Sequence, residues 1–381
     1  MVSGDAETFY RKRSLHPRLQ AIYLVRCDAR SIEERARAIA VEQSVEMPVA
    51  AIADDRVRSY IVGRVEGISE RKAGLFEIRI SLAAETVGRD PGQLINMLFG
   101  NTSLHEDVEL ADVTLPNDLI EYFGGPRQGV HELRRRVGAR ARALTSSPLK
   151  PQGLAPADLA RLAEDFAQAG IDYIKDDHGL AEQAYSPLAA RLEAVAAALR
   201  KLEQKNGQAA RYVPSLSGDL DTMRSQIAAA KEAGLDTVMI APMIAGLSNF
   251  HRLVRENPTV AFIAHPTMAG AARISPPLLL GKLFRMLGAD AVIFPNYGGR
   301  FGYSPDICRA LARAALDERD RLRPAMPVPA GGMHIDRVAE MLDFYGADVM
   351  LLIGGALLEA REHLREATTA FVAAVHRHSY G

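Results

Sequence analysis

One stretch of the chain decides its fold: Gly170-Ile171-Asp172-Tyr173-Ile174-Lys175-Asp176-Asp177-His178. Here a short apolar run ends abruptly in four ionisable residues. Burying such charges costs several kcal/mol unless they are paired or bound to a metal ion. If the run is a buried strand, its C-terminal end therefore opens into a polar site. On a strand, Lys175 and Asp177 point to the same side.

The residue types at this strand end favour metal binding. Asp177 and His178 are both good metal ligands. Lys175 is a poor ligand as an ammonium group, but its neutral amine can add CO2 to form a carbamate, an anionic oxygen ligand. The alternative is a plain Lys–Asp ion pair at a strand end. This stretch alone leaves both interpretations open.

Outward from this stretch, eight apolar runs recur along the chain, each followed by a helical pattern. The runs are Leu144–Leu149, Ile171–Ile174, Tyr212–Leu216, Thr237–Ala241, Val260–Ala264, Ala291–Phe294, Met326–Ala330 and Val349–Ile353. Glycines expected to end helices precede several of them, at Gly170, Gly234, Gly288 and Gly346. This alternation predicts a (β/α)8 barrel. A doubly wound sheet is the competing fold, but it rarely needs eight units so evenly spaced.

The N-terminal third of the chain has a different pattern. Strand candidates at Leu19–Cys27, Val57–Val65 and Leu75–Leu82 surround a helix at Ser31–Glu42, which Ser31 and Glu34 would cap as a capping box. Asp90-Pro91 opens a second helix. We therefore expect an α+β, ferredoxin-like domain over residues 1–129. A linking helix at His131–Ala141 would lead into the barrel of residues 130–381, which ends in a helical extension.

Composition excludes several classes of protein. The 381 residues are 48% hydrophobic and carry a net charge of −1, which gives no general basic face for nucleic acid. Cys27 and Cys308 form no CxxC pair and indicate reduced core residues. The charged stretch Met1–Arg13 does not resemble a signal peptide, and no apolar run is long enough to span a membrane. These features predict a cytoplasmic protein.

Glycine pairs follow the last two runs of the barrel, whose C-terminal face carries the chemistry in this fold. Gly331-Gly332 and Gly354-Gly355 each precede a helical stretch. Backbone N–H groups at such a turn bind phosphate, and the last two loops of a barrel are the usual place for it. The alternative is that the glycines only make tight turns. Two pairs in adjacent loops favour phosphate binding.

Three further side chains follow runs at the same face. Lys150 ends the first run, and His265 ends the fifth. Arg300 lies in the glycine-rich loop after the sixth run, which closes at Ser304-Pro305, a good helix start. His265 could be a packed strand-end histidine, and Arg300 could be an exposed surface residue. The functional interpretations are proton transfer for His265 and an electrostatic lid for Arg300.

In this arrangement the chain resembles the large subunit of ribulose-bisphosphate carboxylase (RuBisCO), and more closely its non-carboxylating relatives, the RuBisCO-like proteins. The matching motifs keep the family's order along most of the chain. They are Gly124–Gly129 for Gln-Gly-Pro-x-x-Gly, Lys150-Pro151-Gln152 for Lys-Pro-Lys, Ala169–His178 for Gly-Gly-Leu-Asp-Phe-x-Lys-Asp-Asp-Glu, Ala330–His334 for Ser-Gly-Gly-Ile-His, and the final Gly354-Gly355. Glu42 and Asn101 fit the family's active-site Glu and Gly-Asn.

Departures from the family pattern argue against a carboxylase. The third metal ligand, a glutamate in the family, is His178. The family's His-Arg pair is His265-Pro266, so an arginine that holds one phosphate of a bisphosphate is missing. Gln152 replaces a lysine, Arg300 replaces the loop lysine that steers CO2, and Met47-Pro48 replaces Thr-Trp. Asn101 stands where the related diketo thiopentyl phosphate enolases use a lysine base, so their mechanism does not carry over.

The resemblance implies metal-assisted enolisation of a sugar phosphate. Lys175, carbamylated by CO2, would hold a divalent ion, with Mg²⁺ expected, together with Asp177 and His178. Lys150 is the candidate base, because a nearby cation disfavours its charged form, and His265 would relay the proton. The four glycines would bind one phosphate. Glu42 and Asn101 would reach the site of a second subunit, which implies a homodimer with shared active sites.

Two outcomes of enolisation fit the resemblance. Reprotonation at a neighbouring carbon gives an isomerase, as in relatives that act on 5-methylthioribulose 1-phosphate in methionine salvage. Loss of CO2 gives a decarboxylase (a lyase), as in relatives that act on 3-oxo-isoapionate 4-phosphate. We favour the isomerase because Lys150 is kept. A non-catalytic regulatory scaffold is a third alternative, and retention of Lys150, Lys175 and Asp177 argues against it.

Overall fold

The computed structural model describes residues 17–207 and 210–380 and contains two compact units. The first is formed by residues 1–123 and the segment 270–278, and the second by residues 124–269 and 279–381. The loop 124–129 thus belongs to the second unit by its contacts. None of the described helices is long and apolar enough to cross a membrane.

An antiparallel sheet forms the centre of the first unit. Its described residues form four strands, in the order β2-β3-β1-β4. The elements are β1 (Arg18–Arg26), α2 (Ile32–Glu42), β2 (Arg64–Lys72), β3 (Leu75–Ala83), α3 (Pro91–Phe99), β4 (Val108–Thr114) and α4 (Asn117–Phe123). The chain order βαββαβ with this strand order is the ferredoxin-like arrangement, so the predicted α+β domain is confirmed.

Local capping explains where the helices of this unit begin. The Asp90 carboxylate accepts a hydrogen bond from the backbone N–H of Gln93 at 2.7 Å, and Pro91 starts α3 as predicted. The predicted capping box at Ser31 is wrong. The Ser31 hydroxyl donates to the carbonyl of Asp28 at 2.9 Å and leaves the helix N–H groups uncapped.

The strand expected at Val57–Val65 is also only partly correct. Val57–Ile61 forms a π-helical turn, and β2 begins at Arg64. The Arg18 guanidinium donates to the carbonyls of Tyr60 and Val62, both at 2.9 Å. This contact between residues far apart in sequence holds the turn in place, and the local apolar pattern gave no sign of it.

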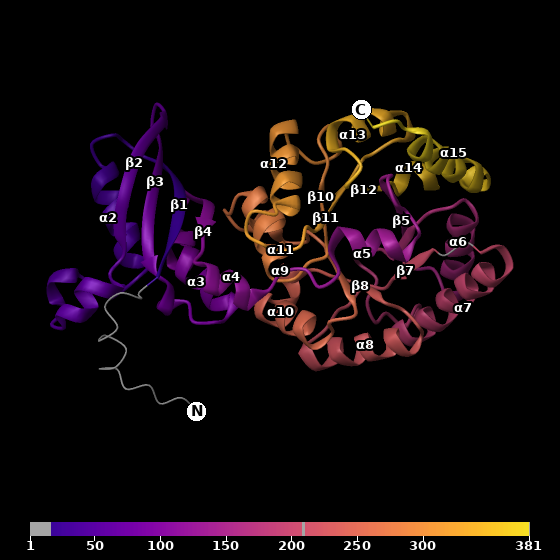
Figure 1. Ribbon diagram of the computed structural model, residues 1–381, viewed down its shortest axis with the longest axis horizontal. Coiled ribbons are helices and arrows are strands. Elements are labelled where there is room, and N and C mark those ends of the chain that lie inside the picture. The colour runs from indigo at the N-terminus through magenta and orange to yellow at the C-terminus, as the bar shows by residue number, and fades with distance from the viewer. Residues whose placement is uncertain (1–16, 208–209, 381) are drawn as a thin grey trace. The chain divides into compact units, whose positions relative to one another are not determined.

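Eight parallel strands of the described residues form the barrel of the second unit (Figure 1). They are β5 (Leu144–Leu149), β6 (Tyr173–Asp176), β7 (Arg211–Val213), β8 (Thr237–Ile240), β9 (Ala261–Ala264), β10 (Ala291–Pro295), β11 (Met326–Ala330) and β12 (Met350–Leu352). A bridge between Ser215 and Met239 joins β7 to β8, and β12 pairs with β5. Each predicted run coincides with a strand, so the barrel is confirmed.

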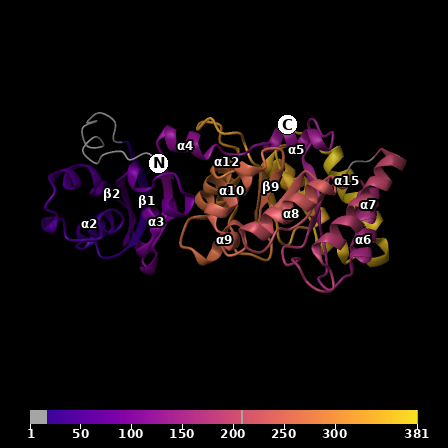
Figure 2. The same ribbon diagram turned by 90° about the horizontal axis from the view of Figure 1, so that it is seen from below.

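Helices surround these strands, with α6, α7, α8 and α10 on the outer surface (Figure 2). The helices of this unit are α5 (Gly129–Arg136), α6 (Pro156–Gln168), α7 (Leu188–Asn206), α8 (Leu220–Glu232), α9 (Pro242–Ala245), α10 (Leu247–Glu256), α11 (Phe284–Met286), α12 (Pro305–Leu316), α13 (Val338–Tyr345), α14 (Gly355–Leu358) and α15 (Leu364–Arg377). The predicted glycine caps adopt the left-handed backbone that favours glycine, with φ +91° at Gly170 and +79° at Gly234. Ser304 caps α12 as predicted.

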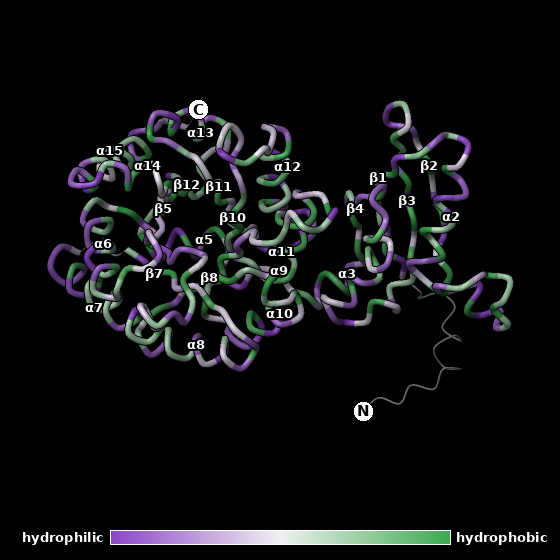
Figure 3. Tube along the Cα trace, turned by 180° about the vertical axis from the view of Figure 1, so that it is seen from behind, coloured by the Kyte–Doolittle hydropathy of each residue, from purple (hydrophilic) through white to green (hydrophobic). Residues whose placement is uncertain are grey.

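The two-residue period of the strands directs the polar side chains into the barrel. Tyr173 and Ile263 lie in the apolar cluster inside the strands, which ring one interior in Figure 3. Because alternate residues of a strand share a face, Lys175 and Asp177 lie on the same inner side as Tyr173, and His265 lies on the same side as Ile263. These residues are at the C-terminal ends of β6 and β9. The apolar cluster fills the barrel below them and gives these side chains a rigid base.

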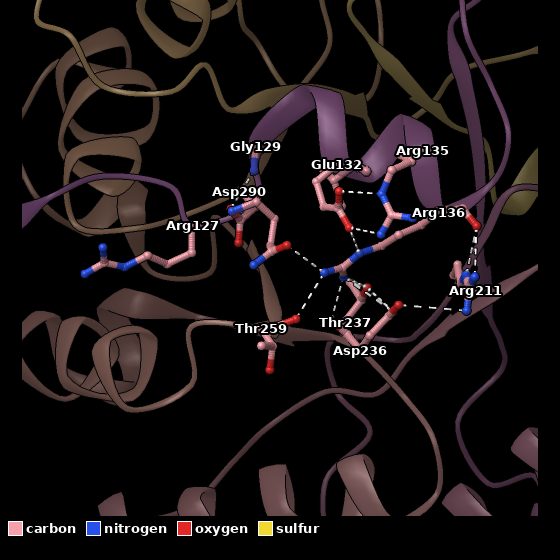
Figure 4. Close-up of polar contacts among 12 residues, drawn as sticks. Arg127, Gly129, Glu132, Arg135, Arg136, Arg211, Asp236, Thr237, Thr259 and Asp290 are labelled. Atoms are coloured by element: carbon pink, nitrogen blue, oxygen red, sulfur yellow. Dashed lines mark hydrogen bonds and ion pairs between the residues drawn. The ribbon is translucent and has the colours of Figure 1, made fainter.

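Helix α5 closes the opposite end of the barrel (Figure 4). The Arg136 guanidinium donates to the carbonyls of Asp236 at 2.6 Å and Thr259 at 3.1 Å, just before β8 and β9. The Asp290 carboxylate accepts hydrogen bonds from the N–H groups of Gln128 at 2.7 Å and Gly129 at 2.8 Å. The predicted linking helix is thus present, but it ends at Arg136 rather than Ala141.

Candidate active site

Side chains from three loops of the barrel meet at its C-terminal end. Lys150 follows β5, Asp177 and His178 follow β6, and His265 follows β9. The Lys150 amine lies 3.6 Å from Asp177 Oδ1. The rings of His178 and His265 stack with their centroids 4.7 Å apart and their planes 4° from parallel. The barrel therefore brings together residues that are more than a hundred positions apart in sequence.

Lys175 is buried beneath these side chains, with 4% of its surface exposed. Its amine donates to the carbonyl of Asp176 at 2.8 Å. Burial lowers the pKa of Lys175 to about 8, with a further contribution from the positive charge of Lys150, against the opposing charges of Asp177 and Asp176. A substantial share of this amine is therefore neutral near pH 8, which is the form that reacts with CO2.

Asp177 is held ionised by its neighbours. Burial opposes its charge, but the hydrogen bond from His178 and the charges of Lys150 and Lys175 outweigh burial and keep its pKa below the ordinary value. Asp177 Oδ1 lies 3.0 Å from His178 Nδ1, and it also accepts from the backbone N–H of His178 at 2.8 Å. Because the carboxylate only accepts, Nδ1 carries the hydrogen, and Nε2 is the ring nitrogen of His178 that has a lone pair for a metal ion.

The donor set fits a divalent ion only if Lys175 takes part. No three His, Cys, Asp or Glu side chains within the described ranges are grouped closely enough to hold a metal ion. Asp177 and His178 supply two ligands of the conventional types, a carboxylate and an imidazole. A carbamate on Lys175 would add an anionic oxygen from the same face of β6, which is the predicted set.

His265 is fixed as a neutral ring. Burial and the charges of Lys175 and His178 lower its pKa to about 2. Its Nδ1 lies 2.6 Å from the Thr267 hydroxyl and accepts from the Thr267 backbone N–H at 3.3 Å. Because Nδ1 accepts, the proton of the neutral ring belongs on Nε2. His265 therefore presents a hydrogen-bond donor, while proton relay through it stays a prediction.

The two glycine pairs keep their N–H groups available. Gly331 and Gly332 have φ values of +85° and +91°. Among the described residues, no backbone or side-chain acceptor meets the N–H groups of these two glycines or of Gly354 and Gly355. Free N–H groups in two adjacent loops are suited to a phosphate.

The loop after β10 packs against the Gly331-Gly332 pair. The Arg300 N–H donates to the carbonyl of Gly331 at 3.2 Å, and a Cβ at Gly332 would lie 2.8 Å from the Arg300 nitrogen. The exposed Arg300 guanidinium stacks on Phe301, 5.1 Å from the ring centroid. The loop thus contacts the predicted phosphate loop, and a lid role for Arg300 stays a prediction.

Glu42 and Asn101 come together within the first unit. The Asn101 side-chain amide donates to Glu42 Oε1 at 2.8 Å and to Glu46 Oε1 at 3.1 Å. Their predicted contribution to the site of a second subunit stays a prediction.

Comparison with known families decides where the chain belongs. A model of the ribulose bisphosphate carboxylase large chain, catalytic domain, matches residues 129–369. The chain belongs to the RuBisCO large-chain family. It is 59% identical over 359 residues to the 5-methylthioribulose-1-phosphate isomerase of Rhodospirillum rubrum, covering 94% of this chain and 96% of the relative. The crystal structure of a RuBisCO-like protein from Rhodopseudomonas palustris matches with a TM-score of 0.90 and 50% identity, over 96% of this chain and all of that one.

A more distant relative also bears the name of an enzyme. The chain is 30% identical over 363 residues to the 2,3-diketo-5-methylthiopentyl-1-phosphate enolase of Geobacillus thermodenitrificans, covering 88% of this chain and 86% of the relative. Relatives named isomerase and enolase support an enzyme rather than a scaffold within this RuBisCO-like group. They give no support to the decarboxylase alternative.

Sequence reasoning missed the residues that support the site in this RuBisCO-like protein. Asp176 points away from Lys175 and pairs with Arg191, at 3.0 Å, with both side chains fully buried. The Tyr212 hydroxyl donates to the same carboxylate at 2.7 Å. This pairing fixes the end of β6, and with it the direction of Asp177. Only the alternation of strand side chains hinted that Asp176 faces outward, and no local pattern marks Arg191 as its partner.

Proposed function

We propose that the protein is a metal-dependent isomerase that acts on 5-methylthioribulose 1-phosphate by 1,3-proton transfer. The observation that carries the proposal is the 59% identity to an isomerase of that name along nearly the whole of both chains. The residues at the barrel mouth have the chemistry that this reaction requires: a base, ligands for a cation and N–H groups for one phosphate.

The divalent ion, expected to be Mg²⁺, would be held by Asp177, His178 and the carbamate of Lys175. When bound, such an ion stabilises negative charge on the oxygen of an enolising ketone. The neighbouring positions of Asp177 and His178 at the end of β6 and the lowered pKa of the buried Lys175 support this assignment.

The side chains of the protein itself account for binding and proton transfer. The glycine N–H groups of the last two loops hold the phosphate, and this fixes the sugar chain across the barrel mouth. Lys150 removes the proton from the carbon beside the ketone and returns it to the former carbonyl carbon, which moves the ketone by one carbon. A second such step moves the ketone one carbon further, so that the two steps together make the 1,3-proton transfer. Asp177, 3.6 Å away, orients the Lys150 amine, and His265 donates its Nε2–H to a substrate oxygen. Glu42 and Asn101 complete the site in a homodimer.

Proton NMR in D2O tests the proposal directly. The protein is incubated with Mg²⁺, bicarbonate and 5-methylthioribulose 1-phosphate. We expect a new ketose phosphate that carries deuterium at a carbon next to the carbonyl. No conversion by a folded protein with a stoichiometric metal ion would overturn the proposal and direct the search to carboxylated sugar phosphates and CO2 release.

His178 predicts a distinctive metal preference. The substitution His178→Glu should strengthen binding of Mg²⁺ relative to Co²⁺ by about tenfold, because a carboxylate is a harder ligand than an imidazole. Calorimetric titration of the metal-free protein with each ion measures the ratio. His334→Glu, at the end of another barrel loop, is the matched control. An unchanged ratio in His178→Glu would mean that His178 is not a ligand.

The lowered pKa of Lys175 predicts that carbamate formation depends on pH. CO2 adds only to the neutral amine, and with a pKa of about 8 the neutral fraction rises as pH increases. At constant CO2, the initial rate should increase about tenfold between pH 7 and pH 9. The carbamate signal after addition of ¹³C-labelled bicarbonate measures this rate independently of turnover. A rate that does not change with pH would contradict the lowered pKa.

A further inference from the structure

The two sides of the barrel mouth differ in chemistry. The strand order places β8 and β9 across the barrel from β12 and β5, and Figure 3 shows β8 opposite β12 and β5. The loops after β11 and β12 carry the free glycine N–H groups, which suit an anion. By contrast, residues 241–250 and 266–269, which follow β8 and β9, include no Asp, Glu, Lys or Arg. A phosphate would find no cation there.

Apolar side chains are exposed on this uncharged side. Ile244 in α9, directly after β8, is 63% exposed, and Met268, four residues after β9, is 55% exposed. The two residues follow neighbouring strands, at the end of the barrel that carries Lys150, Asp177 and His265.

The backbone of Met268 gives an independent indication. The Ala269 N–H donates to the carbonyl of Pro266 at 3.0 Å, which closes a tight turn with Met268 at its third position. Met268 has φ +65°, a conformation that such turns usually give to glycine. Strained residues of this kind gather at ligand sites. The same turn holds Thr267 against His265 Nδ1 at 2.6 Å, so Met268 directly follows a residue that contacts His265.

We infer that Met268 and Ile244 form the subsite for the methylthio group of the substrate. The inference rests on the proposed function, and it identifies the residues that bind the end of the substrate opposite the phosphate. With the phosphate on the glycine loops, the sugar chain crosses the mouth and its thioether end meets the side without charges. A methionine side chain is flexible and polarizable, which suits contact with a second thioether. Burial of the methylthio group there selects it over a hydroxyl.

The substitution Met268→Gly separates this role from a structural one. Glycine relieves the positive φ, so the melting temperature should stay the same or rise. The value of kcat/KM for 5-methylthioribulose 1-phosphate should fall about tenfold. Ribulose 1-phosphate carries a hydroxyl in place of the methylthio group. Its kcat/KM as a substrate, or its inhibition constant as a competitor, should change less than twofold.

Arg321→Gly provides a matched control. Arg321 has φ +63° and is exposed on the loop before β11, so glycine relieves similar strain away from the barrel mouth. This variant should keep the preference of the natural protein for 5-methylthioribulose 1-phosphate over ribulose 1-phosphate. Ile244→Ser, the second test of the subsite, should lower kcat/KM for the methylthio substrate alone, in the same direction as Met268→Gly.

Three results would overturn the inference. Equal losses for both sugar phosphates in Met268→Gly would mean that the turn only positions His265. Unchanged values for both would mean that the methylthio group lies elsewhere. If the natural protein, folded and metal-bound, converts no methylthio substrate, both the proposed function and the inferred subsite are wrong. That result is distinct because it is seen before any substitution is made.

Discussion

Replacement of Lys150 by methionine should lower turnover of 5-methylthioribulose 1-phosphate by about a thousandfold, because general-base catalysis contributes between about a hundredfold and ten-thousandfold. Methionine keeps most of the side-chain volume and removes the amine. Asp177 then retains its hydrogen bond from His178, so the neighbouring charge is not left without a partner. The measurement is deuterium exchange from D2O into the substrate, followed by proton NMR, which should stop together with turnover.

Two further measurements make this result specific. Lys201→Met removes an exposed lysine on α7 and should leave exchange unchanged. Metal affinity, measured by calorimetry, should stay within a few-fold in Lys150→Met, because Lys150 is not one of the proposed ligands. Normal exchange in Lys150→Met would assign the base to another residue, with His265 the next candidate.

Replacement of Lys175 by alanine should abolish metal-dependent activity while the protein stays folded. Only Lys175 can supply the carbamate, which is one of the two anionic ligands of the proposed set. Its loss should therefore weaken metal binding by about a hundredfold. The buried positive charge of Lys175 destabilises the folded state, since burial lowers the pKa of this amine to about 8. Its removal therefore relieves an unfavourable buried charge, which offsets part of the cavity that alanine leaves.

Lys175→Met is the matched variant that avoids the cavity. It should lose the same activity with a melting temperature equal to or above that of the natural protein. Calorimetry with Mg²⁺ in the presence and absence of bicarbonate gives a second readout, because bicarbonate should strengthen metal binding only where Lys175 is present. Retained activity in either variant would remove the carbamate from the mechanism.

Patterns in the sequence were enough to predict the barrel and the inward direction of its polar residues. The signals are local: apolar runs of strand length, helices ended by glycines, and a period of two along each strand. The alternation from Tyr173 to Lys175 and Asp177 is a property of any strand, so it could be read without a structure. Asp90 capped its helix as predicted because the cap and the helix are neighbours in the chain.

The tertiary structure alone decided which groups meet. Asp176 faces Arg191 and Tyr212, the rings of His178 and His265 stack, and Thr267 holds His265. The contact of Asp176 with Tyr212 and the stacking of His178 on His265 join different βα units, so their geometry follows from how the strands close into a barrel. The capping prediction for Ser31 failed for a local reason, because its hydroxyl donates to the carbonyl of Asp28, three residues earlier. The burial that lowers the pKa of Lys175 is likewise a property of the folded barrel, because the local sequence does not fix how much of the amine water reaches.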